Sequence, residues 1–94
     1  MDDEEGLLEL DIYPNPFSSS AHIELKHDKS IELTINVYDL SGKLIDNLFD
    51  GRIEDGVSYR FELKSQDGMN SGMYYIRFIL DNEDVITKPL ILTK

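Results

Sequence analysis

The feature that most constrains this chain is the spacing of its apolar residues, which recur at every second position along much of the sequence. The clearest run is residues 31–38, where isoleucine, leucine and valine alternate with polar residues and a tyrosine. A period of two is typical of a β-strand with one buried and one solvated face. No segment keeps a helical period over about ten residues or more, so we expect little helix. Seven segments are predicted as strands: 7–13, 20–27, 31–39, 43–49, 57–64, 73–81 and 84–92.

Short turn signals separate these segments. Each pairs a small or acidic residue with glycine, which adopts the positive φ angles that tight turns need. The pairs are Ser41-Gly42, Asp50-Gly51, Asp55-Gly56, Asp67-Gly68 and Ser71-Gly72. Short strands with turns at such intervals in a chain of 94 residues predict an all-β fold, a seven-stranded immunoglobulin-like antiparallel β-sandwich. The cysteine and tryptophan that mark antibody domains are absent, so only the architecture is implied.

Two residues indicate finer details of this sandwich. Tyr74 follows Ser71-Gly72 at the start of a strand, where such folds place a tyrosine corner; a simple buried aromatic residue is the alternative. Pro89 has no N–H for a ladder, so the last strand is expected at a sheet edge or bulged at that point. An open edge can accept a strand from another chain.

The residues that carry catalysis or bind metals give no convincing pattern. The chain has no cysteine, which excludes disulfides, thiolate metal sites and thiol nucleophiles. His22 and His27 are expected on opposite faces of one strand, both at the surface, and so cannot share a metal. Ser20, His22 and Asp28 supply the residue types of a hydrolytic triad without a nucleophile elbow or an oxyanion loop. The acids at 81–84 are expected in a solvated hairpin turn. We therefore expect no catalytic residue, no cofactor and no metal.

The charge of the chain excludes two classes of partner. Its net charge is -10, with four of the acids at residues 2–5. Phosphate binding needs a clustered positive surface, so neither nucleic acid nor an anionic membrane is expected as a partner. No apolar stretch reaches the roughly 20 residues of a membrane span, so direct insertion is not expected. We interpret residues 1–11 as an acidic linker remnant, possibly including the first strand from residue 7, and residues 12–94 as one domain.

The segment Tyr13-Pro14-Asn15-Pro16-Phe17 separates this linker from the first alternating strand. Both prolines fix φ near about -65° and restrict the residues before them, so we expect a stiff bend or a polyproline-like conformation. Phe17 is placed to cover the end of the sandwich as a buried plug. On this interpretation the segment has a structural role.

Four sequence blocks in order resemble a known family. They are "YPNPF", "INVYDLSGKLI", "SGMYYIRF" and "ITKPLILTK", and the resemblance covers residues 12–94. In this respect the chain is similar to the type A C-terminal sorting domain of the type IX secretion system of Bacteroidetes. The type B sorting domain has a different pattern.

The resemblance implies delivery of a cargo. Such domains follow an N-terminal cargo domain in a larger exported protein whose own N-terminus carries a Sec signal. The implied partners are the outer-membrane translocon with its shuttle protein, and a sortase-like cysteine peptidase that removes the domain at the surface. The implied route leads through the periplasm to the cell surface or the medium.

The same resemblance implies which residues are recognised. The matching positions are Pro14, Asn15, Pro16 and Phe17; then Tyr38, Asp39, Gly42 and Lys43; then Gly72, Tyr74 and Arg77; and lastly Lys88, Leu90, Ile91, Leu92 and Lys94. Pro89 departs from the family, which often has a second basic residue there. Our hypothesis for the mechanism is recognition through the last strand, whose open edge would supply backbone hydrogen bonds.

Two other functions fit the same architecture. One is an immunoglobulin-like or fibronectin-like accessory or binding module of a secreted protein; a carbohydrate-binding version would use exposed aromatics such as Tyr38 and Tyr75. The other is an interaction domain like those of flagellar hook-capping proteins, which contain a similar "YPNPF" motif.

Overall fold

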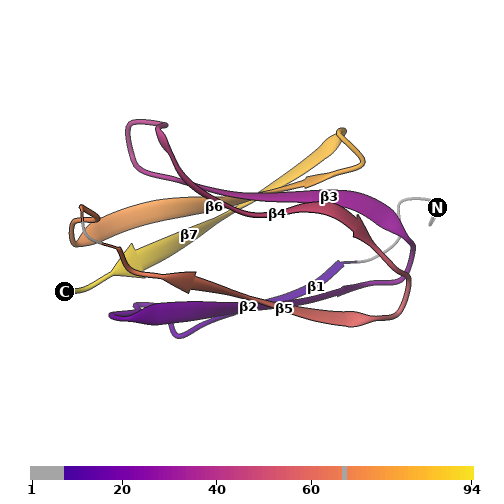
Figure 1. Cartoon of the computed structure of the whole chain (residues 1–94), viewed down its shortest axis with the longest axis horizontal. Helices are drawn as coiled ribbons and strands as arrows, with labels where there is room; N and C mark the ends of the chain where they lie inside the picture. The colour runs from indigo at the N-terminus through magenta and orange to yellow at the C-terminus, as the bar shows by residue number, and fades with distance from the viewer. Residues whose placement is uncertain (1–7, 67) are drawn as a thin grey trace.

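The computed structural model describes residues 8–66 and 68–94, and Figure 1 shows them as two packed layers of strands. The acidic run at residues 2–5 and the expected strand start at residue 7 lie outside the described residues. Within the described part the strands are β1 (Leu8–Tyr13), β2 (Ser20–His27), β3 (Ile31–Tyr38), β4 (Leu44–Ile53), β5 (Ser58–Lys64), β6 (Gly72–Leu80) and β7 (Asp84–Leu92).

The strands form two sheets, one of three strands in the order β1-β2-β5 and one of four in the order β4-β3-β6-β7. All neighbouring strands are antiparallel. The predicted seven-stranded antiparallel sandwich is therefore confirmed. β7 is the outermost strand of its sheet, as expected from Pro89.

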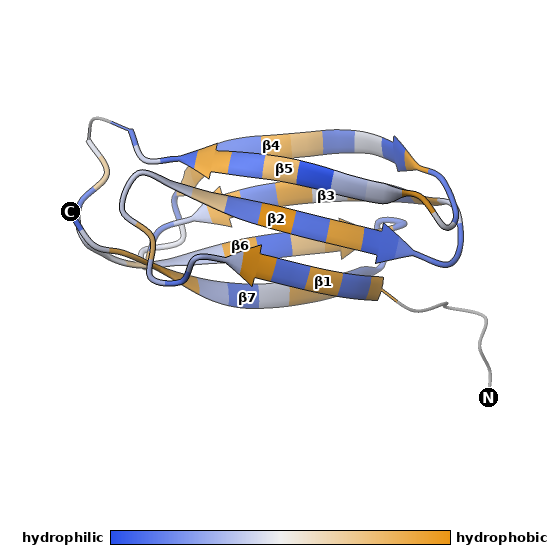
Figure 2. Cartoon of the chain, turned by 90° about the horizontal axis from the view of Figure 1, so that it is seen from below, coloured by the Kyte–Doolittle hydropathy of each residue, from blue (hydrophilic) through white to orange (hydrophobic). Residues whose placement is uncertain are grey.

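The core lies between the two sheets and is built from the inward residues of the alternating strands. Figure 2 shows this alternation as bands of opposite hydropathy along the strands. The burial of these side chains is the main favourable contribution to folding in a domain of this size. The buried apolar residues are Phe17, Ala21, Ile23, Leu25, Ile31, Leu33, Ile35, Val37, Ile53, Leu63, Met69, Tyr74, Ile76, Phe78, Leu80, Leu90 and Leu92.

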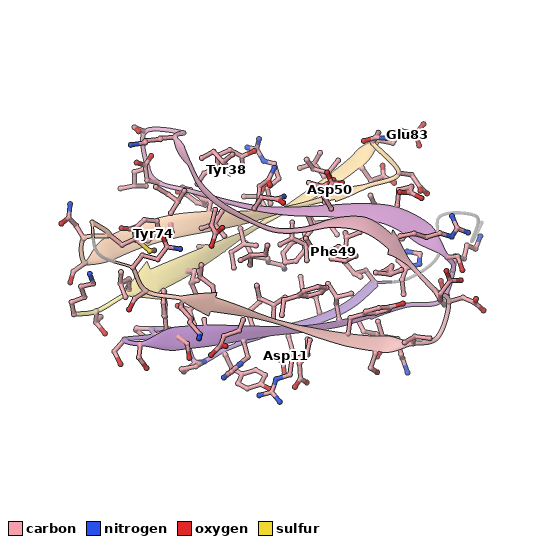
Figure 3. The ribbon with its side chains drawn as sticks, in the orientation of Figure 1. Asp11, Tyr38, Phe49, Asp50, Tyr74 and Glu83 are labelled. Carbon is pink, nitrogen blue, oxygen red and sulfur yellow. The ribbon has the colours of Figure 1, made fainter. Side chains whose placement is uncertain are left out.

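The prediction of a turn at Asp50-Gly51 is wrong, because β4 continues through both residues. Gly51 pairs with Leu33 in the ladder. A methyl group at Gly51 would lie 3.2 Å from the Phe49 ring, which packs against Phe61 of the other sheet with ring centroids 5.0 Å apart. Figure 3 shows Phe49 in the space between the sheets. The glycine therefore makes room for an aromatic ring and does not reverse the chain.

The surface position expected for His27 is also wrong. His27 shares the inward phase of Ala21, Ile23 and Leu25 and is only 1% exposed. Its Nδ1 atom accepts a hydrogen bond of 2.9 Å from the N–H of Lys29, so burial does not leave that nitrogen unpaired. His22 faces outward, as expected for a residue five positions away on the same strand.

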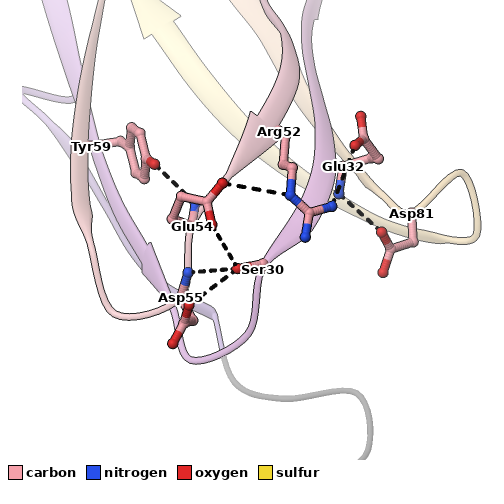
Figure 4. Close-up of polar contacts among 7 residues, drawn as sticks. All are labelled: Ser30, Glu32, Arg52, Glu54, Asp55, Tyr59 and Asp81. Atoms are coloured by element: carbon pink, nitrogen blue, oxygen red, sulfur yellow. Dashed lines mark hydrogen bonds and ion pairs between the residues drawn. The ribbon is translucent and has the colours of Figure 1, made fainter.

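Polar contacts link the loops at the end of the sandwich where β1 begins (Figure 4). Ser30 Oγ accepts a hydrogen bond of 3.0 Å from the N–H of Asp55, in the loop between β4 and β5. Arg52 lies between Glu32 and Glu54, at 3.7 and 3.5 Å. These ion pairs are more than half exposed and contribute little to stability.

The turn expected at Asp81-Asn82 is confirmed. Both residues have positive φ, 53° and 58°, and the N–H of Glu83 donates to the carbonyl of Leu80 at 2.9 Å. The Asp81 carboxylate accepts a hydrogen bond of 2.9 Å from the N–H of Glu32, which anchors the turn to β3. Aspartate and asparagine tolerate this backbone conformation better than most residues do.

Candidate recognition site

The four sequence blocks converge at one end of the sandwich. β1, β3 and β7 run toward this end and β6 starts there, while the described chain begins at the other end (Figure 1). We call this the signature end and define it by residues 13–17, 39–43, 70–74 and 89–94. The end with the turns at residues 28–30, 54–57 and 81–83 is called the linker end.

The side chain of Asn15 binds the edge of β7. Its Oδ1 atom accepts a hydrogen bond of 3.0 Å from the N–H of Ile91, and its Nδ2 atom donates one of 3.2 Å to the carbonyl of Pro89. A carboxamide carries one acceptor and one donor group, as a backbone peptide does. The Asn15 amide thus takes the place of a neighbouring strand.

Phe17 continues this pairing with its backbone. Its N–H donates to the carbonyl of Ile91 and its carbonyl accepts from the N–H of Thr93, both at 2.8 Å, in a parallel bridge to β7. The Phe17 side chain is 1% exposed within the core, so the predicted plug is confirmed. Both proline peptide bonds of the segment are cis and residues 14–16 form a bend, not a polyproline helix.

These contacts correct the expectation of an open edge at β7. From Pro89 to Thr93 the outward backbone groups of this edge strand are paired with Asn15 and Phe17. Pro89 itself has no N–H to offer, and Lys88 places a charge at an inward position of the strand. Proline and inward charges are devices that protect edges from strand addition. Only the first half of β7 is left without such protection.

The predicted residues of β7 and Lys94, which follows it, have different environments. Leu90 and Leu92 are fully buried, so they support the fold and offer no surface. Ile91 points outward and is 38% exposed. Lys88 lies in the middle of the strand, apart from the signature end. Lys94 is held by two hydrogen bonds to the loop between β5 and β6: its N–H donates to Ser71 Oγ at 2.9 Å and its Nζ to the Gln66 carbonyl at 3.2 Å.

Tyr74 forms the tyrosine corner that the sequence indicated as one of two possibilities. Its ring is 6% exposed, and its hydroxyl donates a hydrogen bond of 2.7 Å to the carbonyl of Asn70, four residues upstream. Gly72, two residues before it, has a φ of 147°, a backbone conformation that residues with a side chain rarely adopt. Gly72 and Tyr74 therefore shape the loop that leads into β6.

The turn between β3 and β4 is fixed by the Asp39 carboxylate. Asp39 Oδ1 accepts hydrogen bonds from the hydroxyl of Ser41 at 2.7 Å, the N–H of Lys43 at 3.0 Å and the N–H of Ser41 at 2.9 Å. The Ser41 hydroxyl first, and then the Lys43 N–H, hold the pKa of Asp39 below its ordinary value. Gly42, with a φ of 89°, completes the turn.

Leu40 at the tip of this turn is a residue that sequence reasoning missed. It is 68% exposed on a turn that the hydrogen bonds of Asp39 hold in place. A hollow of about 340 Å³ beside it is lined by Lys43, Gly72 and Tyr74 among others, so two of the sequence blocks meet there. An apolar residue inside an aspartate-glycine turn is the signal that could have identified Leu40.

The described residues contain no group of three or more side chains that could hold a metal ion. Among the same residues, no helix is long and apolar enough to cross a membrane.

Solved structures with the same fold include parts of two much larger proteins. One is dimeric latent PorU from Porphyromonas gingivalis, with a TM-score of 0.69 and 16% identity over 94% of this chain and 9% of that chain. Another is a β-glucosidase from Listeria innocua in complex with glucose, with a TM-score of 0.62 and 14% identity over 95% of this chain and 16% of that one. At such identities the likeness concerns the fold alone.

Comparison with curated protein sequences gives no match. The sequence model of one protein family, described as "Secretion system C-terminal sorting domain", matches residues 11–93. This range includes the four blocks except for the final Lys94, and it includes both halves of the contact between Asn15 and β7. Because the match extends over nearly the whole chain, the protein belongs to the family of secretion system C-terminal sorting domains, the export signals of the type IX system.

Proposed function

We propose that the type IX translocon and its shuttle protein read this sorting signal at the signature end, as one surface made by residues 13–17 and the end of β7. Family membership implies secretion machinery and a parent cargo chain as partners, and export to the cell surface or the medium. The signal was expected at residues 12–94, but Leu8–Asp11 pair with β2 as part of β1, so in this proposal the folded signal begins at Leu8 and the acidic residues 2–5 belong to the linker that joins it to the cargo.

The observation that supports this proposal is the pairing of Asn15 and Phe17 with β7. It joins the first and the last sequence block into one rigid unit through four hydrogen bonds. A component of the secretion machinery that contacts Asn15 would also contact the exposed side of Pro89 and Ile91. Recognition of this kind uses the folded surface, and it does not need the open strand edge of our first hypothesis.

The route and the fate of the domain belong to the same proposal. The folded domain would pass through the periplasm, bind the translocon, and be cut from its cargo at the cell surface by a sortase-like cysteine peptidase. The acidic run at residues 2–5 is the expected region of cleavage, since it would lie between the cargo and β1 in the parent chain.

The test is a reporter protein behind a Sec signal, fused to the complete 94-residue chain and expressed in a bacterium with a type IX system. Asn15→Asp keeps the acceptor for Ile91 but places a carboxylate against the Pro89 carbonyl. The matched control, Asn82→Gly, changes an asparagine at the linker end whose positive φ glycine accepts. The delivered fraction is measured on whole cells and in the medium.

We expect Asn15→Asp to lower delivery strongly and Asn82→Gly to leave it unchanged, while both chains remain folded in thermal unfolding. Equal delivery by both variants would show that the signature end is not read through Asn15. Deletion of Leu90–Lys94 is a poor test, because it removes two fully buried leucines and therefore the fold.

The accessory-module alternative is favoured by one observation, the likeness of the fold to part of a β-glucosidase. Its carbohydrate-binding version needs flat exposed aromatic faces. The Arg77 guanidinium lies 5.0 Å from the centre of the Tyr38 ring and covers one face of it. Tyr38 and Tyr75 are both only partly exposed. These contacts disfavour stacking of a sugar on Tyr38.

A further inference from the structure

The outer face of the four-stranded sheet carries a row of apolar and aromatic residues that crosses all four strands. Leu44 of β4 is opposite Tyr38 of β3, Tyr38 is opposite Tyr75 of β6, and Tyr75 is opposite Pro89 of β7. Directly opposed residues lie on the same side of a sheet and contact one another. Figure 3 shows Tyr38 on the side that faces away from the three-stranded sheet.

Three more apolar residues extend this row toward the signature end. Met73 and Ile91 are opposite each other and are 37% and 38% exposed. Leu40, on the turn that Asp39 fixes, lines a hollow together with Met73. We call the row and these residues the outer apolar face: Tyr38, Leu40, Leu44, Met73, Tyr75, Pro89 and Ile91.

Arg77 places one positive charge on this face. Its guanidinium lies over the Tyr38 ring, and it is opposite Thr87 of β7, a neutral residue. Tyr38, Leu40, Tyr75, Arg77 and Thr87 line a hollow of about 340 Å³. Asp39 also lines it, but its carboxylate accepts hydrogen bonds within its own turn. A ligand in this hollow could therefore contact the Arg77 guanidinium, which the Tyr38 ring holds from one side.

The composition of this face favours a protein as its ligand. Tyrosine, arginine and methionine are enriched at protein interfaces, and tyrosine and arginine are among the residues that dominate their binding energy. Apolar residues held on a rigid turn and a rigid sheet lose little conformational entropy on binding. The covered Tyr38 ring disfavours a glycan, and the net charge of -10 disfavours nucleic acid and anionic lipid.

The charges indicate which protein segment fits. Acids gather at the linker end, among them Asp28, Glu54, Asp55, Glu83 and Asp84, whereas Arg77 and Lys43 lie on either side of Leu40. A basic partner would be drawn to the linker end and away from this face. A carboxylate that enters the hollow beside Leu40 can pair with the arginine in a bidentate contact.

We propose that the outer apolar face docks a segment of the secretion machinery that presents an aspartate or glutamate flanked by apolar side chains. This rests on the proposed function, because it takes the machinery as the partner, but it concerns a different face from the Asn15 contact. Pro89 and Ile91 lie at the boundary of both surfaces, so one partner can cover them together. Leu40 and Arg77 are the anchors that only the docking face uses.

The experiment measures binding of the complete 94-residue chain to the outer-membrane translocon with its shuttle protein, purified in detergent from a bacterium with a type IX system. Arg77→Gln is matched by Arg60→Gln on the outer face of the other sheet, and Leu40→Ser by Val57→Ser at the linker end. All four side chains are exposed or partly exposed, so the variants should fold, and thermal unfolding checks that they do.

We expect Arg77→Gln to raise the Kd by about tenfold or more, and Leu40→Ser to raise it similarly because it removes apolar area that the partner would bury. Both controls should leave the Kd unchanged. The wild-type Kd should rise with salt more steeply than that of Arg77→Gln, because screening weakens the arginine contact. Equal binding by all variants overturns the docking proposal, as does a salt dependence that Arg77→Gln does not alter.

Two further results separate this proposal from the proposed function. If Asn15→Asp abolishes binding while Arg77→Gln and Leu40→Ser bind like the wild type, the Asn15 surface is read and the outer apolar face is not. If Arg77→Gln and Leu40→Ser fail to bind and Asn15→Asp binds normally, the outer apolar face is recognised and the Asn15 surface is not. Self-association that Arg77→Gln abolishes, measured by sedimentation without translocon, would make a second copy the occupant and overturn the proposal.

Discussion

The Asn15 side chain and the Ile91 N–H, 76 positions apart in sequence, are joined by a hydrogen bond of 3.0 Å. The same carboxamide binds the Pro89 carbonyl, so a single side chain pairs two outward backbone groups of an edge strand. The pairing joins the N-terminal and the C-terminal segments of the domain. Together with the Phe17 backbone, it also removes from the second half of β7 the free backbone groups that would allow another chain to add a strand there.

Asn15→Ala should lower the free energy of unfolding by about 1 kcal/mol, since it removes two hydrogen bonds whose backbone partners can then bind water. The site is exposed, so no buried group is left unpaired. Urea denaturation checks this value, with Asn82→Gly as the control. A loss of several kcal/mol would mean that the whole segment detaches from β7.

Phe17→Ala should lower the free energy of unfolding by about 3 to 5 kcal/mol, because the ring is fully buried and its removal leaves a cavity at the end of the core. Much of the stability of a small domain would then be lost. Phe17→Leu should cost clearly less, since it fills most of the space. Equal costs for the two variants would contradict the role of the ring as a plug.

Tyr74→Phe tests the tyrosine corner without changing the packing of the ring. The Asn70 carbonyl loses its partner, and we expect the free energy of unfolding to fall by about 1 kcal/mol. Tyr75→Phe is the matched control, since Tyr75 lies on the outer face of the same strand. A smaller effect at Tyr74 than at Tyr75 would contradict a structural role for the hydroxyl of Tyr74.

Alternation made the sheets predictable, because a buried face imposes its period on every strand that lines it. Ile76, Phe78 and Leu80 follow this rule along the whole of β6. The same rule applied to the end of β2 would have placed His27 inside with Leu25. The prediction failed there because the polarity of histidine was given more weight than its position in the strand.

Other features depend on residues that are distant in sequence. Gly51 resembles a turn glycine until the Phe49 ring is seen to pack over it and reach Phe61 in the other sheet. The contact of Arg77 with Tyr38 follows from the register of β3 with β6, which local patterns do not determine. The proline segment was predicted as a rigid bend, but its binding of β7 needs the tertiary fold.

Acid should weaken the turn that presents Leu40. Hydrogen bonds depress the pKa of Asp39 in the folded chain relative to the unfolded one. A depressed pKa adds stability at a pH above the unfolded value of about 4, and this contribution is lost as the pH falls through the lower folded pKa.

The variant Asp39→Asn has no titrating group at this position, although its side-chain oxygen can still accept hydrogen bonds from Ser41 and Lys43. We therefore expect wild type to be more stable than Asp39→Asn at neutral pH, with the difference shrinking below about pH 4. Thermal unfolding of both chains across this range measures it, and a difference that stays constant with pH would show that the carboxylate charge does not stabilise the turn.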